Sequence, residues 1–210
     1  MPPAGDILPL KVAKRVGRMV ATVPALVSLL VRNRGGGVVA PRVQGFVRAV
    51  RAAEDPARPG EGAVPKVGVV GFCWGGRYTV WLTHDTAENR VVGVDGVEWV
   101  VVDCAFTAHP TWVGIPEDVE GVVQSLSVAN GEDDKWMGME KWERLREILK
   151  RKNEAAGGEV HEAVEYRGAK HGFVVRGDRA DPLQKKRGEK SEEQAVEWFR
   201  EHLEGVRVGD

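Results

Sequence analysis

The sequence predicts an α/β fold in which a mostly parallel sheet is flanked by helices. After residue 64, four short segments rich in strand-forming residues alternate with longer segments of helical periodicity, and this alternation is typical of βα units with parallel strands. The first of these strands, residues 66–72, also runs directly into a helical pattern through the glycine-rich stretch 71–76. So abrupt a turn from strand to helix is a second sign of an α/β architecture.

The region before the first strand predicts helices and a loop. Residues 6–33 are expected to form a helix bent at Pro24, and residues 43–53 form an amphipathic one. The apolar run 19–31 is too short to span a bilayer comfortably, and no small-residue cleavage site follows it. We therefore interpret this run as a helix that packs on the core or docks on the surface.

The remaining elements follow from apolar periodicity and from breaks rich in Gly and Pro. Strands are expected at residues 66–72, 98–106, 124–129 and 160–166, and helices at residues 137–153 and 191–203. Residues 54–65 are rich in Pro, Gly and charge and are expected to form a loop. With neither an internal repeat nor a linker, residues 1–210 are predicted to form a single domain.

Composition excludes several classes of function. The 210 residues carry a net charge of −1, so no global basic field points to nucleic acid. The two cysteines, Cys73 and Cys104, provide neither a disulfide framework nor a CxxC metal motif. We expect no bound metal, no membrane association and a reducing, cytoplasmic location.

Cys73 is the first candidate for chemistry. It lies at the centre of Gly71-Phe72-Cys73-Trp74-Gly75-Gly76, and a reactive residue with glycines two positions away on either side, between a strand and a helix, is the pattern of a nucleophile elbow. The start of a helix favours the thiolate form of such a cysteine. Taken alone the motif is weak, since cysteines and small residues also fill buried turns.

Two later loops supply an acid and a base. Glu132, Asp133 and Asp134 follow the third strand, and His171 follows the fourth. The order nucleophile, acid, histidine is that of the α/β-hydrolases, and side chains beyond the carboxyl ends of parallel strands meet at one edge of the sheet. The residues alone leave all three acids open. The alternative interpretation is that the three acids form a solvated run of charges and that His171 is an ordinary loop histidine.

The other histidines and the second cysteine have simpler interpretations. His109 ends the second strand and is placed to line the cleft, whereas Cys104 lies within a strand pattern and is expected in the core. Surface positions are expected for His84, His161 and His202.

Five segments together resemble the dienelactone hydrolase family, the carboxymethylenebutenolidase-like α/β-hydrolases. They are Gly71-Phe72-Cys73-Trp74-Gly75-Gly76, Ala108-His109-Pro110-Thr111, Gly131-Glu132-Asp133-Asp134, the loop from Gly168-Ala169-Lys170-His171-Gly172-Phe173 to Asp178, and Glu193-Gln194-Ala195-Val196-Glu197-Trp198-Phe199. The resemblance covers roughly residues 64–203. It implies that Cys73 is the nucleophile, His171 the base and Asp134 the orienting acid.

The resemblance also implies a substrate site. Arg176 resembles an arginine that meets a substrate carboxylate, and His109 and Phe173 are expected to bind substrate beside it. The backbone N–H of Trp74 is expected to donate to the oxyanion. Family members usually carry further N-terminal strands, whose loop supplies a second oxyanion donor. Because only helix and loop are expected before residue 66, we predict an N-terminally shortened sheet with residues 66–72 central.

Two functions follow as hypotheses. The first is hydrolysis of small carboxylic esters or lactones by a Cys-His-Asp triad, with a preference for anionic substrates and without metal or organic cofactor. The second is a catalytically weak or inactive truncated relative that acts as a binding or interaction protein. An exposed sheet edge would favour homo-oligomers in either case.

Overall fold

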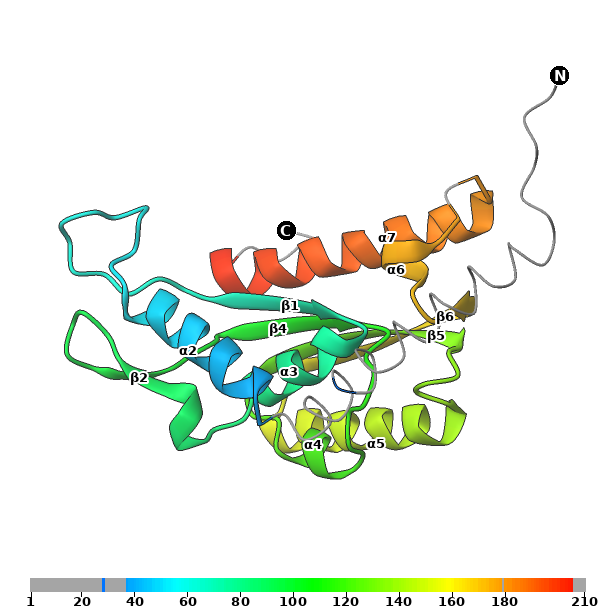
Figure 1. Ribbon diagram of the computed structural model, residues 1–210, viewed down its shortest axis with the longest axis horizontal. Helices are drawn as coiled ribbons and strands as arrows, with labels where there is room; N and C mark the ends of the chain where they lie inside the picture. Colours follow the sequence, from blue (N-terminus) through cyan, green and yellow to red (C-terminus); the bar gives the residue numbers. More distant parts are fainter. Residues whose placement is uncertain (1–27, 29–36, 179, 206–210) are drawn as a thin grey trace, which may run out of the picture. The chain divides into compact units, whose positions relative to one another are not determined.

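The computed structural model describes residues 28, 37–178 and 180–205 (Figure 1). The chain divides into two units, Met1–Arg42 and Val43–Asp210, and the account below concerns the second. The helix predicted over residues 6–33 and its apolar run lie outside the described residues, apart from residue 28.

Four parallel strands form the main sheet of this unit. They are β1 (Gly68–Phe72), β4 (Cys104–Ala108), β5 (Ser125–Asp133) and β6 (His161–Lys170), in the order β1-β4-β5-β6. The strands of a parallel sheet are expected to be buried and apolar, and all five residues of β4 are buried. The carboxyl ends of these strands meet at one edge of the sheet.

Helices cover both faces of the sheet (Figure 1). On one face α3 (Trp74–Leu82), α4 (Glu117–Glu120) and α5 (Met139–Ala156) enclose a core that includes Ala105 of β4. On the other face α7 (Pro182–Phe199) and the short α6 (Phe173–Arg176) pack against Cys104 and Phe106. Because successive side chains of a strand alternate between faces, β4 supplies both cores. The predicted mostly parallel sheet flanked by helices is confirmed.

The predicted strand over residues 98–106 is wrong as a single element. Residues Glu98–Val100 form β3, which pairs antiparallel with β2 (Arg90–Val92) after the 3₁₀ turn η1 (Ala87–Asn89), and only β4 belongs to the main sheet. The chain turns between the two strands at Asp103, whose carboxylate accepts hydrogen bonds from the Arg51 guanidinium and the Val67 N–H. Hydrophobicity alone could not locate this polar anchor within an apolar run.

The predicted central position of the first strand is also wrong for the described residues. β1 pairs only with β4 there and forms the edge of the four-stranded sheet, where 52% of Val70 is exposed. A central position requires a second partner strand, and the part of the chain described before residue 68 contains only α2 (Val39–Ala52) and a loop. Association of copies through this edge stays a prediction.

The helix boundaries differ most at the carboxyl end of the chain. α7 begins at Pro182, nine residues before the predicted start, and is followed by the π-helical turn η2 (Arg200–Glu204). Asp181 caps α7 by accepting from the N–H groups of Leu183 and Gln184, with Pro182 in the first turn. Within the described ranges, no helix is both long and apolar enough to cross a membrane.

Candidate active site

Cys73 lies on a strained turn between β1 and α3. Its φ of 51° and ψ of −120° fall in a region that residues with a Cβ atom rarely adopt. Hydrogen bonds on both sides hold this conformation: the Cys73 N–H donates to the Ala108 carbonyl (3.3 Å), and its own carbonyl accepts from Thr111 (2.9 Å). The loop after β4 therefore fixes the elbow.

Two glycines make room for the elbow. A Cβ on Gly71 would lie 2.1 Å from the Thr79 hydroxyl, and one on Gly76 would lie 2.4 Å from the Thr107 hydroxyl. Gly75, by contrast, has open space around it. The close approach of α3 to the strands thus depends on Gly71 and Gly76 within the sequence motif.

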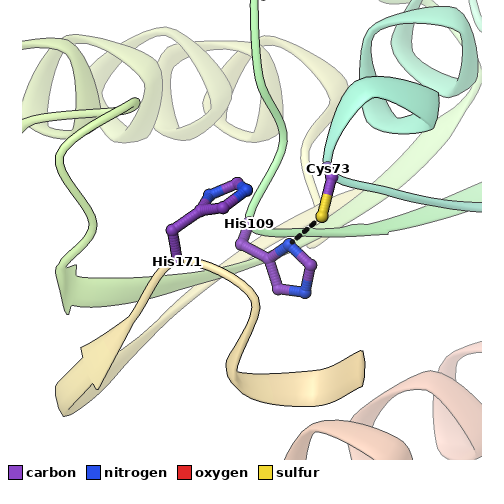
Figure 2. Close-up of side chains that lie close together, drawn as sticks. All are labelled: Cys73, His109 and His171. Atoms are coloured by element: carbon purple, nitrogen blue, oxygen red, sulfur yellow. Dashed lines mark hydrogen bonds between the residues drawn. The ribbon is translucent and has the colours of Figure 1, made fainter. Parts of the chain in front are cut away.

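His109 contacts the thiol directly. It follows β4 with a φ of 42°, is fully buried, and donates its backbone N–H to Ala129 (2.7 Å). Its Nδ1 lies 3.3 Å from the Cys73 Sγ (Figure 2). With the thiol proton shared toward Nδ1, the ring proton is on Nε2, which is buried and has no hydrogen-bond partner among the described residues.

Asp134 and His171 form a second pair at the same edge of the sheet. The His171 Nδ1 lies 2.9 Å from the Asp134 Oδ2, and the Asp134 side chain is completely buried. Its other oxygen accepts from the Trp136 N–H (2.8 Å). Asp133 and Glu132 are exposed, and Glu132 accepts from the Gly168 N–H. Of the three acids left open by the sequence, Asp134 is the one that contacts His171.

The thiol and the two imidazoles converge. Figure 2 shows them entering from the loops after β1, β4 and β6. One ligating atom from each of Cys73, His109 and His171 lies within 4.8 Å of the other two. Since His171 Nδ1 faces Asp134, its Nε2 is free to face the thiol. Cys73, His171 and Asp134, for which the sequence predicts the roles of nucleophile, base and acid, thus lie close together, with His109 as an additional neighbour of the sulfur.

Burial and Arg176 have opposite effects on the thiol. Burial raises the pKa of Cys73, and the Arg176 guanidinium, whose Nη2 is 3.6 Å from the sulfur, partly opposes this effect. The Trp74 backbone N–H also lies against the sulfur and favours the thiolate. The thiolate-favouring shift expected from the helix start is therefore outweighed, because the sulfur is only partly accessible to water.

Burial shifts the pKa values of three further groups toward their neutral forms: His109 beside the thiol, and Cys104 and His161 at the starts of β4 and β6. Burial, reinforced by the nearby His171, lowers the pKa of His109 to about 4. Burial raises the pKa of Cys104 to about 12 in the fully buried strand β4, as its expected core position requires. His161, expected at the surface, is instead buried at the start of β6 with a pKa lowered to about 4.

Aromatic side chains surround the histidines. Phe173 lies buried with its ring centroid 5.6 Å from that of His109. The Trp136 ring is 6.1 Å from His171 and 6.4 Å from Trp112, and 54% of Trp136 is exposed. Sequence reasoning missed both tryptophans, although Trp136 stands two residues after the acid and Trp112 follows Thr111 directly. They form an open aromatic wall beside His171.

Known proteins resemble this chain in sequence. The sequence profile of the dienelactone hydrolase family matches residues 37–203. Hydrolase tropI of Talaromyces stipitatus is 30% identical over 138 residues, which are 66% of this chain and 46% of that protein. Hydrolase pyvD of Aspergillus violaceofuscus is 28% identical over 66% of this chain and 48% of its own length. The chain thus spans about half the length of these curated relatives.

Solved structures share the α/β-hydrolase-like fold. The dienelactone hydrolase-like promiscuous phosphotriesterase P91, from metagenomic libraries, superposes with a TM-score of 0.56 at 17% identity, over 86% of this chain and 69% of P91. Esterase 2 of Thermogutta terrifontis gives a TM-score of 0.51 at 17% identity, over 76% of this chain and 64% of the esterase. At these identities the likeness establishes the fold alone.

Proposed function

Because the chain belongs to the dienelactone hydrolase family, we propose that it hydrolyses small carboxylic esters or lactones with a triad of Cys73, His171 and Asp134. One observation carries the proposal: a buried carboxylate orients His171, and a ring nitrogen of His171 lies within 4.8 Å of the sulfur of a strained elbow. Nucleophile, base and orienting acid in this relation are the general requirement for nucleophilic acyl transfer.

The resting thiol is protonated, since burial raises its pKa. At rest the thiol proton points to His109, a neutral acceptor 3.3 Å away. When the substrate binds, His171 takes the proton as the sulfur attacks the carbonyl carbon. The Trp74 N–H stabilises the oxyanion, and the protonated His171 donates its proton to the departing alkoxide.

A thioester on Cys73 is the product of this first half. Water then gives a proton to His171 and attacks the thioester carbonyl, and the sulfur leaves as thiolate and recovers the proton. An ester yields an acid and an alcohol, whereas a lactone yields a single hydroxy acid. All these steps use groups of this chain alone.

Arg176 and the aromatic wall suggest the substrate's shape. The Arg176 guanidinium is exposed and close to the reacting sulfur, so that a carboxylate on the substrate would meet a bidentate donor. Trp136 and Trp112 offer flat apolar surface beside His171. An anionic ester with an unsaturated or ring-shaped body fits these surroundings best. The Phe173 ring packs against His109.

A second candidate function is binding without efficient catalysis, with copies of this chain paired at the sheet edge. The edge of β1, which has no second partner strand among the described residues, favours it, because unpaired strand edges promote association. On this hypothesis the triad would be a remnant, and the aromatic wall would hold a ligand that is not turned over.

Ester turnover by the purified chain separates the two. We expect hydrolysis of an activated aryl ester, a loss of at least about 10³-fold in Cys73→Ala, and near wild-type turnover in Cys104→Ala, whose sulfur is buried in β4. With Trp74 as the expected oxyanion donor, unactivated lactones should react far more slowly, by roughly 3–4 kcal/mol in barrier. Equal turnover by wild type and Cys73→Ala would refute the triad.

A further inference from the structure

The thiol and the two imidazoles at the elbow have the composition of a transition-metal site. Cys73, His109 and His171 offer one sulfur and two nitrogens within 4.8 Å of one another. Zinc prefers these donors, and a site with three protein ligands keeps a fourth position open for water or another small ligand. The residues come from three separate loops that the sheet holds together (Figure 2).

The distances between the sulfur and the nitrogens fit a tetrahedral metal ion after a small movement of His171. Bond lengths of about 2.3 Å to sulfur and about 2.0 Å to nitrogen place S and N about 3.5 Å apart around zinc. The Cys73 Sγ and His109 Nδ1 are 3.3 Å apart. His171 must approach by on the order of 1 Å to complete the cage, since zinc holds its nitrogen ligands about 3.3 Å apart. The His171 side chain is partly exposed, which leaves room for this shift.

The surroundings of His171 are those of a metal ligand, and His109 is held in position although its buried Nε2 has no hydrogen-bond partner among the described residues. Asp134 accepts from His171 Nδ1 (2.9 Å), and a carboxylate behind a ligating histidine fixes its tautomer and orientation. His109 is fully buried and held by its backbone bond to Ala129, so that its Nδ1 is already aimed at the sulfur. One group opposes a cation: the Arg176 guanidinium, 3.6 Å from the sulfur.

We propose that Cys73, His109 and His171 bind one Zn²⁺ or a similar soft divalent ion, with a solvent molecule in the fourth position. The thiol proton leaves to solvent as the sulfur–metal bond forms, while each imidazole contributes a nitrogen lone pair. Bound metal occupies the sulfur and the nitrogen that hydrolysis would use. Binding therefore inhibits the enzyme reversibly; this inhibitory consequence, unlike the binding itself, rests on the proposed function.

Metal titration tests the site without reference to activity. Competition for Zn²⁺ with a chromophoric chelator should give one ion per chain, and Co²⁺ should give a sulfur-to-cobalt charge-transfer absorption. Cys73→Ser should abolish that absorption and weaken Zn²⁺ binding by at least about 100-fold, and Asp134→Asn should weaken it by about 10–100-fold. Cys104→Ala is the matched control and should bind as the wild type does.

Two further variants sharpen the test. His109→Asn should weaken Zn²⁺ binding as strongly as Cys73→Ser, with circular dichroism checking its fold. Arg176→Gln should tighten binding several-fold, because it removes the positive charge beside the sulfur. Zn²⁺ that binds Cys73→Ser and His109→Asn as tightly as wild type, or a wild-type chain that binds no ion, would overturn the proposal.

Activity then distinguishes the two proposals. If the chain hydrolyses esters and Zn²⁺ inhibits it reversibly, with a chelator restoring turnover, both stand. If the chain binds Zn²⁺ through Cys73 but turns over no ester, the proposed hydrolase function fails and the metal site stands. If the chain hydrolyses esters equally with and without excess Zn²⁺, the metal proposal fails and the hydrolase stands.

Discussion

The carboxyl edge of the sheet and the layer between α5 and the sheet contrast in their backbone geometry. At the edge, Cys73, His109 and Trp112 have φ angles of 51°, 42° and 59°, and they are the non-glycine residues with positive φ among those described. α5 instead runs as regular helix to a left-handed glycine, Gly157 (φ 70°), which is the expected residue at that position. Three departures from ordinary geometry thus fall within one short stretch of the sheet's edge.

The difference shows which region stabilises the fold and which region destabilises it. Each strained residue costs about 1–3 kcal/mol, and such residues gather where a site must hold side chains in one arrangement. On α5, Trp142, Leu145 and Leu149 repeat at helical spacing and are almost completely buried. Their burial contributes roughly 1.5–3 kcal/mol apiece. The core layer therefore offsets the strain of the site.

The largest expected effect concerns the acid at the edge. Asp134→Asn should lower turnover by about 10⁴-fold, because an amide cannot hold His171 in the tautomer that accepts the thiol proton. The folded state should change little in stability, since an amide oxygen can still accept from Trp136. Steady-state kinetics on an activated ester measure the effect. Asp133→Asn, at an exposed position, is the control, and a loss in that variant instead would make the acid assignment wrong.

The sequence predicted the sheet's main strands and the residues that meet at its edge. Buried parallel strands form continuous apolar runs, and Cys73, Asp134 and His171 each follow one of them. What the sequence could not supply was the choice between Asp133 and Asp134 from the residues alone. Adjacent residues at the end of a strand point to opposite faces, and only the register of β5 against β6 decides which one reaches His171.

The misplaced elements have equally physical reasons. Residues 98–106 are apolar except for Glu98 and Asp103, and the chain turns at Asp103, where the carboxylate pairs with the distant Arg51. His161 is buried although glutamates stand close to it on both sides, at Glu159 and Glu162. Both features depend on how segments far apart in the sequence pack together, which local periodicity does not encode.

The second largest effect concerns the core layer. Leu145→Ala should lower the free energy of unfolding by about 2–5 kcal/mol, because it leaves a cavity between α5 and the sheet. Turnover per folded molecule should stay the same at temperatures well below melting. Urea unfolding measures the loss. Leu183→Ala, on an exposed position of α7, should change stability by less than about 0.5 kcal/mol; equal losses in both variants would contradict the core assignment.

A smaller effect depends on pH and lies away from the edge. Burial first, and then the nearby Lys152 and His202, lower the pKa of His161 to about 4. As the pH falls below about 6.5, the unfolded chain binds this proton before the folded one does, so stability declines down to about pH 4 and then levels off.

The expected loss from His161 between pH 7.5 and pH 5.5 is about 1 kcal/mol. Urea unfolding at both values, in wild type and in His161→Gln, isolates it. The variant should lose less stability on acidification than the wild type by that amount. An unchanged difference between the two pH values would show that His161 is protonated equally in both states.

The smallest effect tests the strain itself. At a φ of 51° and ψ of −120°, any residue with a Cβ atom is strained, whereas glycine adopts this conformation freely. Cys73→Gly should therefore be more stable than Cys73→Ala by about 1 kcal/mol, although both lack the sulfur and are expected to be inactive. Urea unfolding of the two variants side by side makes the comparison, because each removes the same contacts with His109 and Arg176. A glycine that proves less stable than alanine here would mean that the turn is not held under strain, and that the elbow differs from the core layer in chemistry but not in backbone energy.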